Sequence, residues 1–319
     1  MISLWRRIPA GYRSTIFLWL AVLALFLIGE ALFSGFFSRS HASSIFRSAS
    51  FIGMVAIGQT LIVLTGGIDL SVGPLVSLGN VFACFMLEGK DENNLLAFSV
   101  IILIGAAVGL ANGVGVSVLG ISPMVMTMAM GVITTGITLI YSQGAPTGFA
   151  SPFLRSIGTG YTVGVPNSVI LWFGMSAVIL LVLKRTTFGR GVYYIGANET
   201  AAVFAGLRRH SIKTATYVIS GLTAALTGII IAGYTATAFI NTGKDSTMSS
   251  ITAVVIGGTA MTGGKGGYGG TIAGAILICL IESILTMMDM REAGKKIMNG
   301  IVILILIALY YRKKKTEKA

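Results

Sequence analysis

An aspartate within a glycine-rich interruption is the first candidate for chemistry in this chain. Residues 65–74, TGGIDLSVGP, separate two long apolar segments and contain a carboxylate, a hydroxyl and several helix breakers. A carboxylate beside hydrocarbon costs about 3 kcal/mol at a helix centre on insertion scales. Irregular backbone persists at membrane depth only where protein or a water-filled cavity satisfies its polar groups. The run therefore favours a protein that moves a solute over a passive anchor.

The place of this run between two apolar segments gives Asp69 a second interpretation. At a turn into the third segment, the carboxylate is expected to cap the N-terminus of the third helix, where the helix dipole favours negative charge. Glycine at such a turn permits a sharp break in the backbone. We therefore predict a structural joint, and only secondarily a ligand contact, formed by Gly66, Gly67, Asp69, Ser71 and Gly73.

Four further polar residues fall inside apolar segments and are candidates for a translocation path. The alternative is that they form hydrogen bonds between helices, worth about 0.6 kcal/mol on average, and this is the favoured interpretation for each. The acidic member is the hardest to explain in this way, since a carboxylate within a span usually faces a cavity or a partner. The four residues are Gln59, Asn80, Asn112 and Glu282.

The loop at 184–211 is predicted to contain a short helix. Asn198 is a good N-cap, Glu199 suits the positive end of the helix dipole, and Gly206 can end the helix after about two turns. A helix this short is marginal alone in water and needs a surface to bury its apolar side. A groove in a partner protein fits at least as well as a lipid surface, because no basic amphipathic pattern is present. The residues assigned to this docking helix are Asn198, Glu199, Thr200, Ala201, Ala202, Phe204 and Gly206.

A second glycine cluster follows the eighth apolar segment. Dense glycine lets backbones approach and helices break, so a hinge is predicted at Gly263, Gly264 and Gly266. Residues 258–265 resemble a phosphate-binding loop, but Thr259 replaces a required glycine and Gly266 replaces the hydroxyl that would hold magnesium. ATP and magnesium are therefore expected on a separate chain, and no enzymatic activity is expected here.

No other cofactor or metal site is predicted. Cys84 and Cys279 both lie in apolar runs and are interpreted as small buried hydrophobic residues. His41 and His210 lie far apart in loops, so they do not form a metal-binding cluster.

Composition defines the class of protein that must position these residues. Of 319 residues, 54% are hydrophobic and 11% are charged, whereas a soluble domain has about 25% charged residues. The net charge of +12 does not indicate nucleic-acid binding, because the basic residues flank apolar segments and no aromatic-interleaved basic stripe is present. An all-α polytopic membrane protein in a lipid bilayer is predicted, with 1–319 as one transmembrane domain and no soluble domain.

About ten apolar segments approach the ~20 residues that a spanning helix needs. Fifteen of the 23 Lys and Arg residues fall on one side of this map, which by the positive-inside rule places both termini in the cytoplasm. The eighth segment is short and is expected to be re-entrant or broken. The segments are 15–33, 51–67, 70–87, 95–119, 121–141, 165–183, 212–233, 250–262, 268–288 and 296–311.

Three motifs in this order resemble those of the ribose-type permeases of bacterial ABC sugar importers. They are Thr65 to Gly73, Phe188 to Gly206, and Ala253 to Gly258 with Gly263 to Ala275. The resemblance covers the chain from the second segment to the last. One departure is Ala197, which stands where the family usually has a second glycine before the asparagine; alanine still permits the cap.

The resemblance implies a fold, partners and a mechanism. The fold would be an all-helical permease of about ten spans, similar in architecture to the vitamin B12-type importers, in the bacterial cytoplasmic membrane. It would work as a dimer of permease chains, with an ABC ATPase subunit on the cytoplasmic side and an extracytoplasmic solute-binding protein that delivers the ligand. The helix at 198–206 would be the coupling helix that docks in the ATPase.

The favoured function is therefore ATP-driven uptake of a monosaccharide or a related small polar solute, without covalent chemistry in this chain. The family also has members for nucleosides and a furanosyl signalling compound. One alternative is an ion-coupled secondary carrier that uses Asp69 and Glu282 as proton or sodium sites. Another is a channel or scaffold without energy coupling.

Overall fold

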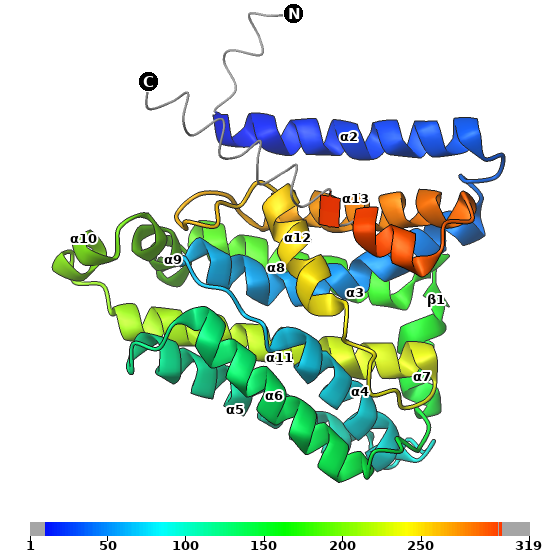
Figure 1. The fold of residues 1–319 in the computed structure, drawn as a ribbon, viewed down its shortest axis with the longest axis horizontal. Helices are drawn as coiled ribbons and strands as arrows, with labels where there is room; N and C mark the ends of the chain where they lie inside the picture. The colour runs from blue at the N-terminus through cyan, green and yellow to red at the C-terminus, as the bar shows by residue number, and fades with distance from the viewer. Residues whose placement is uncertain (1–9, 299, 302–319) are drawn as a thin grey trace, which may run out of the picture.

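The computed structural model describes residues 10–298 and 300–301, in which helices form almost all of the regular structure (Figure 1). Two strands of two residues each pair antiparallel in a small hairpin. The elements in chain order are α2 (Ala10–Leu32), α3 (Arg39–Leu64), α4 (Val72–Leu87), α5 (Asn94–Ser117), α6 (Pro123–Ser142), α7 (Pro152–Thr159), β1 (Tyr161–Thr162), β2 (Val165–Pro166), α8 (Asn167–Arg185), α9 (Thr187–Ala197), α10 (Glu199–Phe204), α11 (Arg209–Thr235), α12 (Ser246–Ile256) and α13 (Tyr268–Met287).

Within the described part of the chain, seven helices are long and apolar enough to cross a membrane: α2, α3, α5, α6, α8, α11 and α13. The 16 residues of α4 and the 11 of α12 are also apolar but shorter. At 1.5 Å per residue they extend about 24 and 17 Å, less than the ~30 Å hydrocarbon thickness. The bounds of α4 match the predicted segment 70–87 within two residues, and whether this short helix crosses the membrane stays a prediction; the short eighth segment was expected. The predicted span at 296–311 lies largely outside the described residues.

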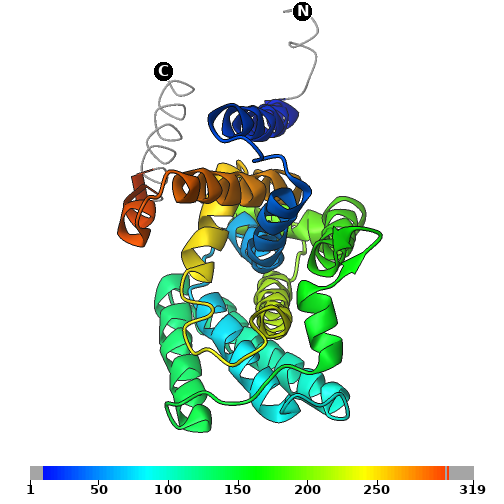
Figure 2. The same ribbon diagram turned by 90° about the vertical axis from the view of Figure 1, so that its right-hand side faces the viewer.

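The long helix α11 lies in the interior of the bundle. Figure 2, in which α11 is seen nearly end-on, shows α11 between α3 on one side and α4 and α5 on the other. Glycine at every fourth position of α5 (Gly105, Gly109 and Gly113) allows the two backbones to touch. A Cβ on Gly109 would lie 2.4 Å from the carbonyl oxygen of Tyr217. The packing between α5 and α11 is thus backbone against backbone.

Two apolar clusters fill the bundle. One lies around α3, α8 and α13, and includes Leu61, Trp172 and Ile276; the other lies around α4, α5 and α11, and includes Leu75 and Ala225. The helix α2 packs mainly over α13 at the top of Figure 1, and much of its apolar surface stays exposed.

Several boundaries differ from the sequence predictions. The helix α3 begins at Arg39 and not near 51, because its first three turns are polar and hydropathy does not detect them. Ser38 caps this helix by accepting a hydrogen bond from the His41 amide. The stretch between the predicted segments 121–141 and 165–183 contains α7 and β1, and the loop at 184–211 contains α9 besides α10; these elements are too short or too polar to appear as spans.

Candidate functional site

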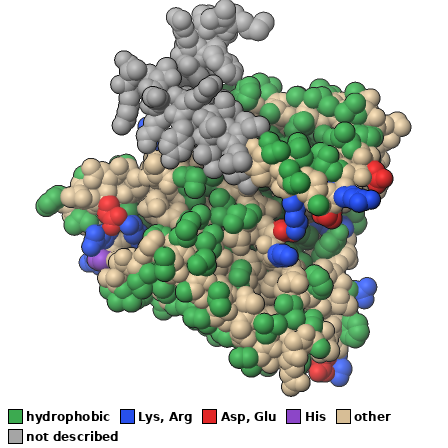
Figure 3. Space-filling model, in the orientation of Figure 1, with side chains coloured by type: hydrophobic (Ala, Val, Ile, Leu, Met, Phe, Trp, Pro, Cys, Tyr) green, Lys and Arg blue, Asp and Glu red, His purple; other side chains and the backbone are tan. Residues whose placement is uncertain are grey.

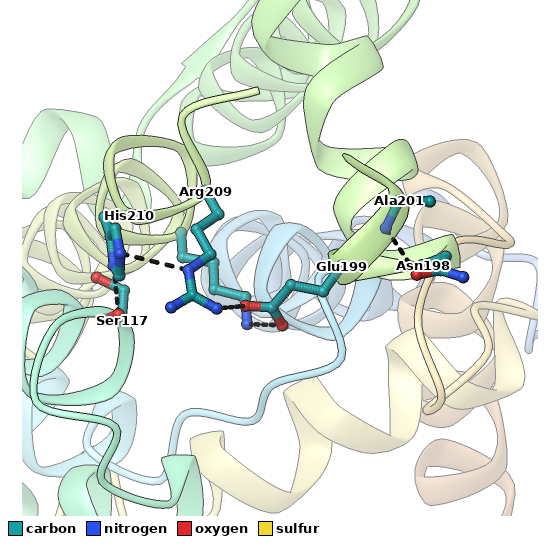
Figure 4. Close-up of polar contacts among 7 residues, drawn as sticks. Ser117, Asn198, Glu199, Ala201, Arg209 and His210 are labelled. Atoms are coloured by element: carbon teal, nitrogen blue, oxygen red, sulfur yellow. Dashed lines mark hydrogen bonds and ion pairs between the residues drawn. The ribbon is translucent and has the colours of Figure 1, made fainter. Parts of the chain in front are cut away.

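The short helix predicted in the loop at 184–211 is α10, which projects from one end of the molecule (Figure 1). The Asn198 side chain accepts a hydrogen bond from the Ala201 amide at 3.0 Å, as an N-cap does (Figure 4). At the other end, Gly206 adopts φ +83°, and the Leu207 amide donates to the carbonyl of Ala202 at 3.0 Å. The N-cap and the glycine terminator predicted for this helix are both confirmed.

The apolar surface of α10 is smaller than the sequence suggests, but one side chain dominates it. Phe204 is 87% exposed, and Val203, which was not predicted, is 43% exposed. Ala202 is buried against the rest of the chain. Ala201 and Thr200 are exposed beside them. The helix therefore presents a phenyl ring to its surroundings.

Two basic residues of α11 hold α10 in place. Lys213 Nζ lies 2.6 Å and Arg209 Nη1 3.3 Å from the carboxylate oxygens of Glu199 (Figure 4). Burial raises the pKa of the Glu199 carboxyl, but the hydrogen bonds and positive charges of Lys213 and Arg209 outweigh it, so this pKa lies below its ordinary value. Nothing in the spacing of Arg209 and Lys213 along the sequence connects them with Glu199, so these ion pairs could not be predicted.

The ion-pair cluster continues to α5. Arg209 Nε donates to His210 Nε2 at 3.3 Å, and His210 Nδ1 is hydrogen-bonded to the carbonyl of Ser117 at the end of α5 (Figure 4). Because Nε2 accepts this hydrogen bond, Nδ1 is the ring nitrogen that donates to the Ser117 carbonyl. A continuous set of polar contacts therefore connects α10, α11 and α5.

The ion pair at Glu199 predicts a pH dependence for α10. A carboxyl whose pKa is depressed on folding stabilises the folded state above its unfolded pKa, and this contribution disappears as the pH falls through the folded pKa. We expect hydrogen-exchange protection of the α10 amides to be constant from about pH 8 to 5 and to fall below about pH 4. Glu199→Gln should show low protection across this range. Lys184→Met removes a charge at the same end of the molecule without touching Glu199, and its α10 amides should be protected as in the wild type. If the α10 amides of Glu199→Gln are as protected as those of the wild type, the ion pairs do not stabilise α10.

Three glycine motifs, far apart in sequence, meet directly behind α10. The Gly264 amide donates to the carbonyl of Leu64, the last residue of α3, at 2.9 Å. A Cβ on Gly196 would lie 1.8 Å from that same carbonyl oxygen and 2.5 Å from the Gly264 nitrogen. A Cβ on Gly263 would lie 3.0 Å from the nitrogen of Gly66. We call this contact of α9 with the two glycine motifs the glycine junction.

The predicted hinge glycines adopt conformations that favour glycine. Gly263, Gly264 and Gly266 have φ values of +84°, +74° and +116°. A side chain is strained in this region of φ, so the non-helical segment 257–267 depends on these positions. Whether the segment moves as a hinge stays a prediction.

Asp69 is buried in a polar cluster that connects 65–71 to two helices. One carboxylate oxygen accepts from the Ser71 amide (2.8 Å) and hydroxyl (2.6 Å), and the other accepts from Ser220 of α11 (2.8 Å). Asn112 of α5 donates to the Ser71 hydroxyl at 2.9 Å. The carboxylate lies at the N-terminus of α4, as predicted, but its hydrogen bonds there come from Ser71, the N-cap residue itself, and not from amides of the first turn. The cluster fixes the path of an unwound segment.

A second junction lies where the two short helices begin. The segment 236–245 is not helical, and it lies along one face of α4 formed by Gly73, Ser77 and Asn80. Ser77 accepts from the Gly243 amide at 2.9 Å and Asn80 from the Phe239 amide at 2.8 Å. The Gly73 amide donates to Thr247 in the first turn of α12 at 3.1 Å. The N-termini of the two short helices, α4 and α12, therefore meet.

The four predicted path residues do not line one channel. Asn112 belongs to the Asp69 cluster and Asn80 to the second junction. Gln59 is fully buried in α3, and neither atom of its amide makes a hydrogen bond with the described residues. Glu282 borders a cavity of about 280 Å³ between α3 and α13, where His41 Nε2 and the Ser283 hydroxyl lie 2.8 Å apart. Asn80 and Asn112 therefore make hydrogen bonds that connect helices and segments, and a role in a translocation path stays a prediction for all four residues.

Seven long apolar helices among the described residues, together with two short ones that follow non-helical segments, define a polytopic helical membrane protein of the transporter type. Residues 41–307 match the family described as "Branched-chain amino acid transport system / permease component", and the chain belongs to this permease family. No solved structure matches the chain.

Characterised relatives are similar over most of their length. The chain is 32% identical to the ribose import permease protein RbsC of Haemophilus influenzae over 90% of each chain. It is also 32% identical to RbsC of Bacillus subtilis over 92% of each. The fructose import permease protein FrcC of Rhizobium meliloti is 29% identical over 90% of this chain and 82% of the relative.

Proposed function

We propose that this chain is the permease subunit of an ATP-binding-cassette importer, and that it passes a monosaccharide or a related small polar solute across the membrane. The observation that carries the proposal is α10: a capped helix of six residues, held by two ion pairs, that exposes a phenyl ring. Such a helix is marginal without a partner, so a groove in another protein accounts for it. The relatives named as ribose and fructose import permeases support the same function.

The partner at α10 would be an ATPase subunit, which also supplies ATP and magnesium. Movement of that subunit would displace α10 and, through Gly196, the glycine junction at the end of α3. It would also reach α11 through Glu199, and from there the Asp69 cluster. Asp69, Ser71, Gly66, Gly67 and Gly73 would then serve as a joint between the coupling end and the unwound segments.

The finer topology follows from the same assignment. The end that carries α10 would face the cytoplasm, with both termini on that side of a bacterial inner membrane. Counting α4, α12 and the segment at 296–311, ten segments would enter the bilayer, in an architecture like that of the vitamin B12-type importers. A second permease chain would complete the pathway, and a solute-binding protein would dock at the end that carries α7.

The solute class rests on the relatives. The family description refers to branched-chain amino acids, whereas the relatives at 32% identity are named for ribose. Sequence identity over 90% of each chain favours a monosaccharide. A nucleoside or a furanosyl signalling molecule is the alternative substrate class.

Ion-coupled transport is the alternative mechanism, with Asp69 and Glu282 as ion sites. The geometry favours the ATP-driven proposal, because serine donors already occupy both carboxylate oxygens of Asp69. The two acids also lie in different places, one in the interior cluster and one beside His41 between α3 and α13.

Reconstitution distinguishes these mechanisms. The permease is placed in proteoliposomes with its cognate ATPase and binding protein, and uptake of radiolabelled ribose and fructose is measured. We expect uptake only when all three proteins and ATP are present. Uptake by the permease alone, driven by an imposed proton or sodium gradient, would establish the ion-coupled carrier instead.

A further inference from the structure

A cavity of about 290 Å³ lies beside the second junction, between α4, α6 and the non-helical segment 236–245. It is on the face of the molecule that Figure 3 presents, where the surface is hollowed between α12 and α6 and charged side chains gather beside the hollow. Its polar lining residues are Ser77, Thr135, Thr138, Asn241 and Lys244.

The lining offers both kinds of hydrogen-bonding group. Thr135 and Thr138 donate their hydroxyl protons to carbonyls one turn earlier in α6, at 2.9 Å each, so their oxygens are left with lone pairs that can only accept from a molecule in the cavity. Lys244 supplies an ammonium donor and forms no ion pair with the described residues. Asn241 supplies a donor and an acceptor.

This pattern fits a neutral polyhydroxylated solute. Each hydroxyl of a sugar is at once a donor and an acceptor, and so needs both kinds of partner. No carboxylate is among the lining residues to bind a cation. An anion would face the lone pairs of two threonines. At the ~30 Å³ that one water molecule occupies in the liquid, the cavity has room for about ten non-hydrogen atoms, the size of a pentose.

We infer that this cavity, which we call the junction chamber, is the place in the permease where a monosaccharide in transit contacts this chain. The inference rests on the proposed function and adds to it the contacting residues, Thr135, Thr138, Asn241 and Lys244. None of these four is among the translocation-path residues predicted from the sequence. Asn80 and Ser77 have a positioning role, since they hold the segment that forms one wall.

The first experiment tests whether the junction chamber is open to water. Cys84 and Cys279, both buried, are replaced by alanine in the full chain, assembled with its ATPase and binding protein. Thr135→Cys should then react with a membrane-impermeant thiosulfonate, and ribose at about 10 mM should slow the reaction. Ile133→Cys, an exposed apolar position two residues away, is the matched control and should not react. Equal reactivity at both positions, or no reaction at Thr135→Cys, would overturn the inference.

The second experiment measures transport with a matched pair of threonines. Thr134 and Thr138 are both buried in α6 and both donate to a carbonyl one turn earlier, but only Thr138 borders the chamber. Thr138→Val should lower ribose uptake about tenfold, whereas Thr134→Val should change it less than about twofold. Lys244→Gln should behave like Thr138→Val, with stimulation of ATP hydrolysis by the binding protein retained. Equal effects of the two valine variants would overturn the inference.

The two proposals fail in different ways. If the wild type shows no ATP-driven uptake while Thr135→Cys still reacts, the proposed function is wrong, and the chamber is open to water but is not a contact site for a transported sugar. If the wild type transports ribose while Thr135→Cys is inert, the function stands and the chamber assignment is wrong.

Discussion

Phe204→Ala is expected to release the ATPase subunit from the permease and to lower ATP-dependent uptake about 100-fold. Phe204 is 87% exposed on a helix that makes few other contacts, so its ring supplies most of the apolar area available for docking. A buried aromatic anchor at an interface typically contributes about 2–4 kcal/mol, which corresponds to roughly 30- to 1,000-fold in affinity. The measurement is co-purification of the ATPase with the permease in detergent, followed by uptake in proteoliposomes.

The control for this variant is Phe149→Ala. Phe149 is also an exposed phenylalanine, 62% accessible, but it lies next to α7 at the opposite end of the molecule. Association with the ATPase should be unchanged in this variant. If Phe204→Ala binds the ATPase as tightly as the wild type, the coupling assignment of α10 does not hold.

Gly196→Ala is expected to disrupt the glycine junction and to separate ATP hydrolysis from transport. The added methyl group would lie 1.8 Å from the carbonyl oxygen of Leu64, so α9 must move away from the end of α3. Overpacking of this kind costs typically about 1–3 kcal/mol and sometimes more. We expect a lower melting temperature in detergent, and a lower ratio of solute transported to ATP hydrolysed in the protein that remains folded.

Gly174→Ala provides the matched control, because its added methyl group would meet no atom within 4 Å and the residue lies within α8. Alanine is favoured over glycine inside a helix, so this variant should melt at or slightly above the wild-type temperature. A Gly196 variant that melts and transports like the Gly174 variant would show that the close approach of α9 and α3 is not required.

The sequence predicted α10 because its signals are local. An N-cap asparagine, an acid in the first turn and a terminating glycine all lie within nine residues. The partners of Glu199 could not be predicted in the same way, since Arg209 and Lys213 belong to the next helix and reach it only through the turn at Gly206. The same limit applies to the glycine junction, whose contacts join residues up to 200 positions apart.

Hydropathy located most of the long helices and also α4, which begins two residues after the predicted segment at 70. It displaced α12, which covers Ser246–Ile256 and not 250–262, because the first turn of α12 is polar. The segment 236–245 contains no strong signal at all, and its position depends on hydrogen bonds with Ser77 and Asn80 of α4. The junction chamber was therefore beyond sequence analysis, because one of its walls is a loop placed by tertiary contacts.

The direct contact of the α5 and α11 backbones has a mechanical consequence. Because Gly105, Gly109 and Gly221 lie at the contact, few side chains separate the two helices, and the pair should move as one rigid body. The 27 residues of α11 give this rigid body a length of about 40 Å, from the ion pairs at Glu199 to the close contact of Gly233 with α7. Over that length a tilt of about 3° displaces the far end by roughly 2 Å. A small push at the end that holds α10 would thus arrive at the α7 end as a shift comparable to the radius of a solute atom.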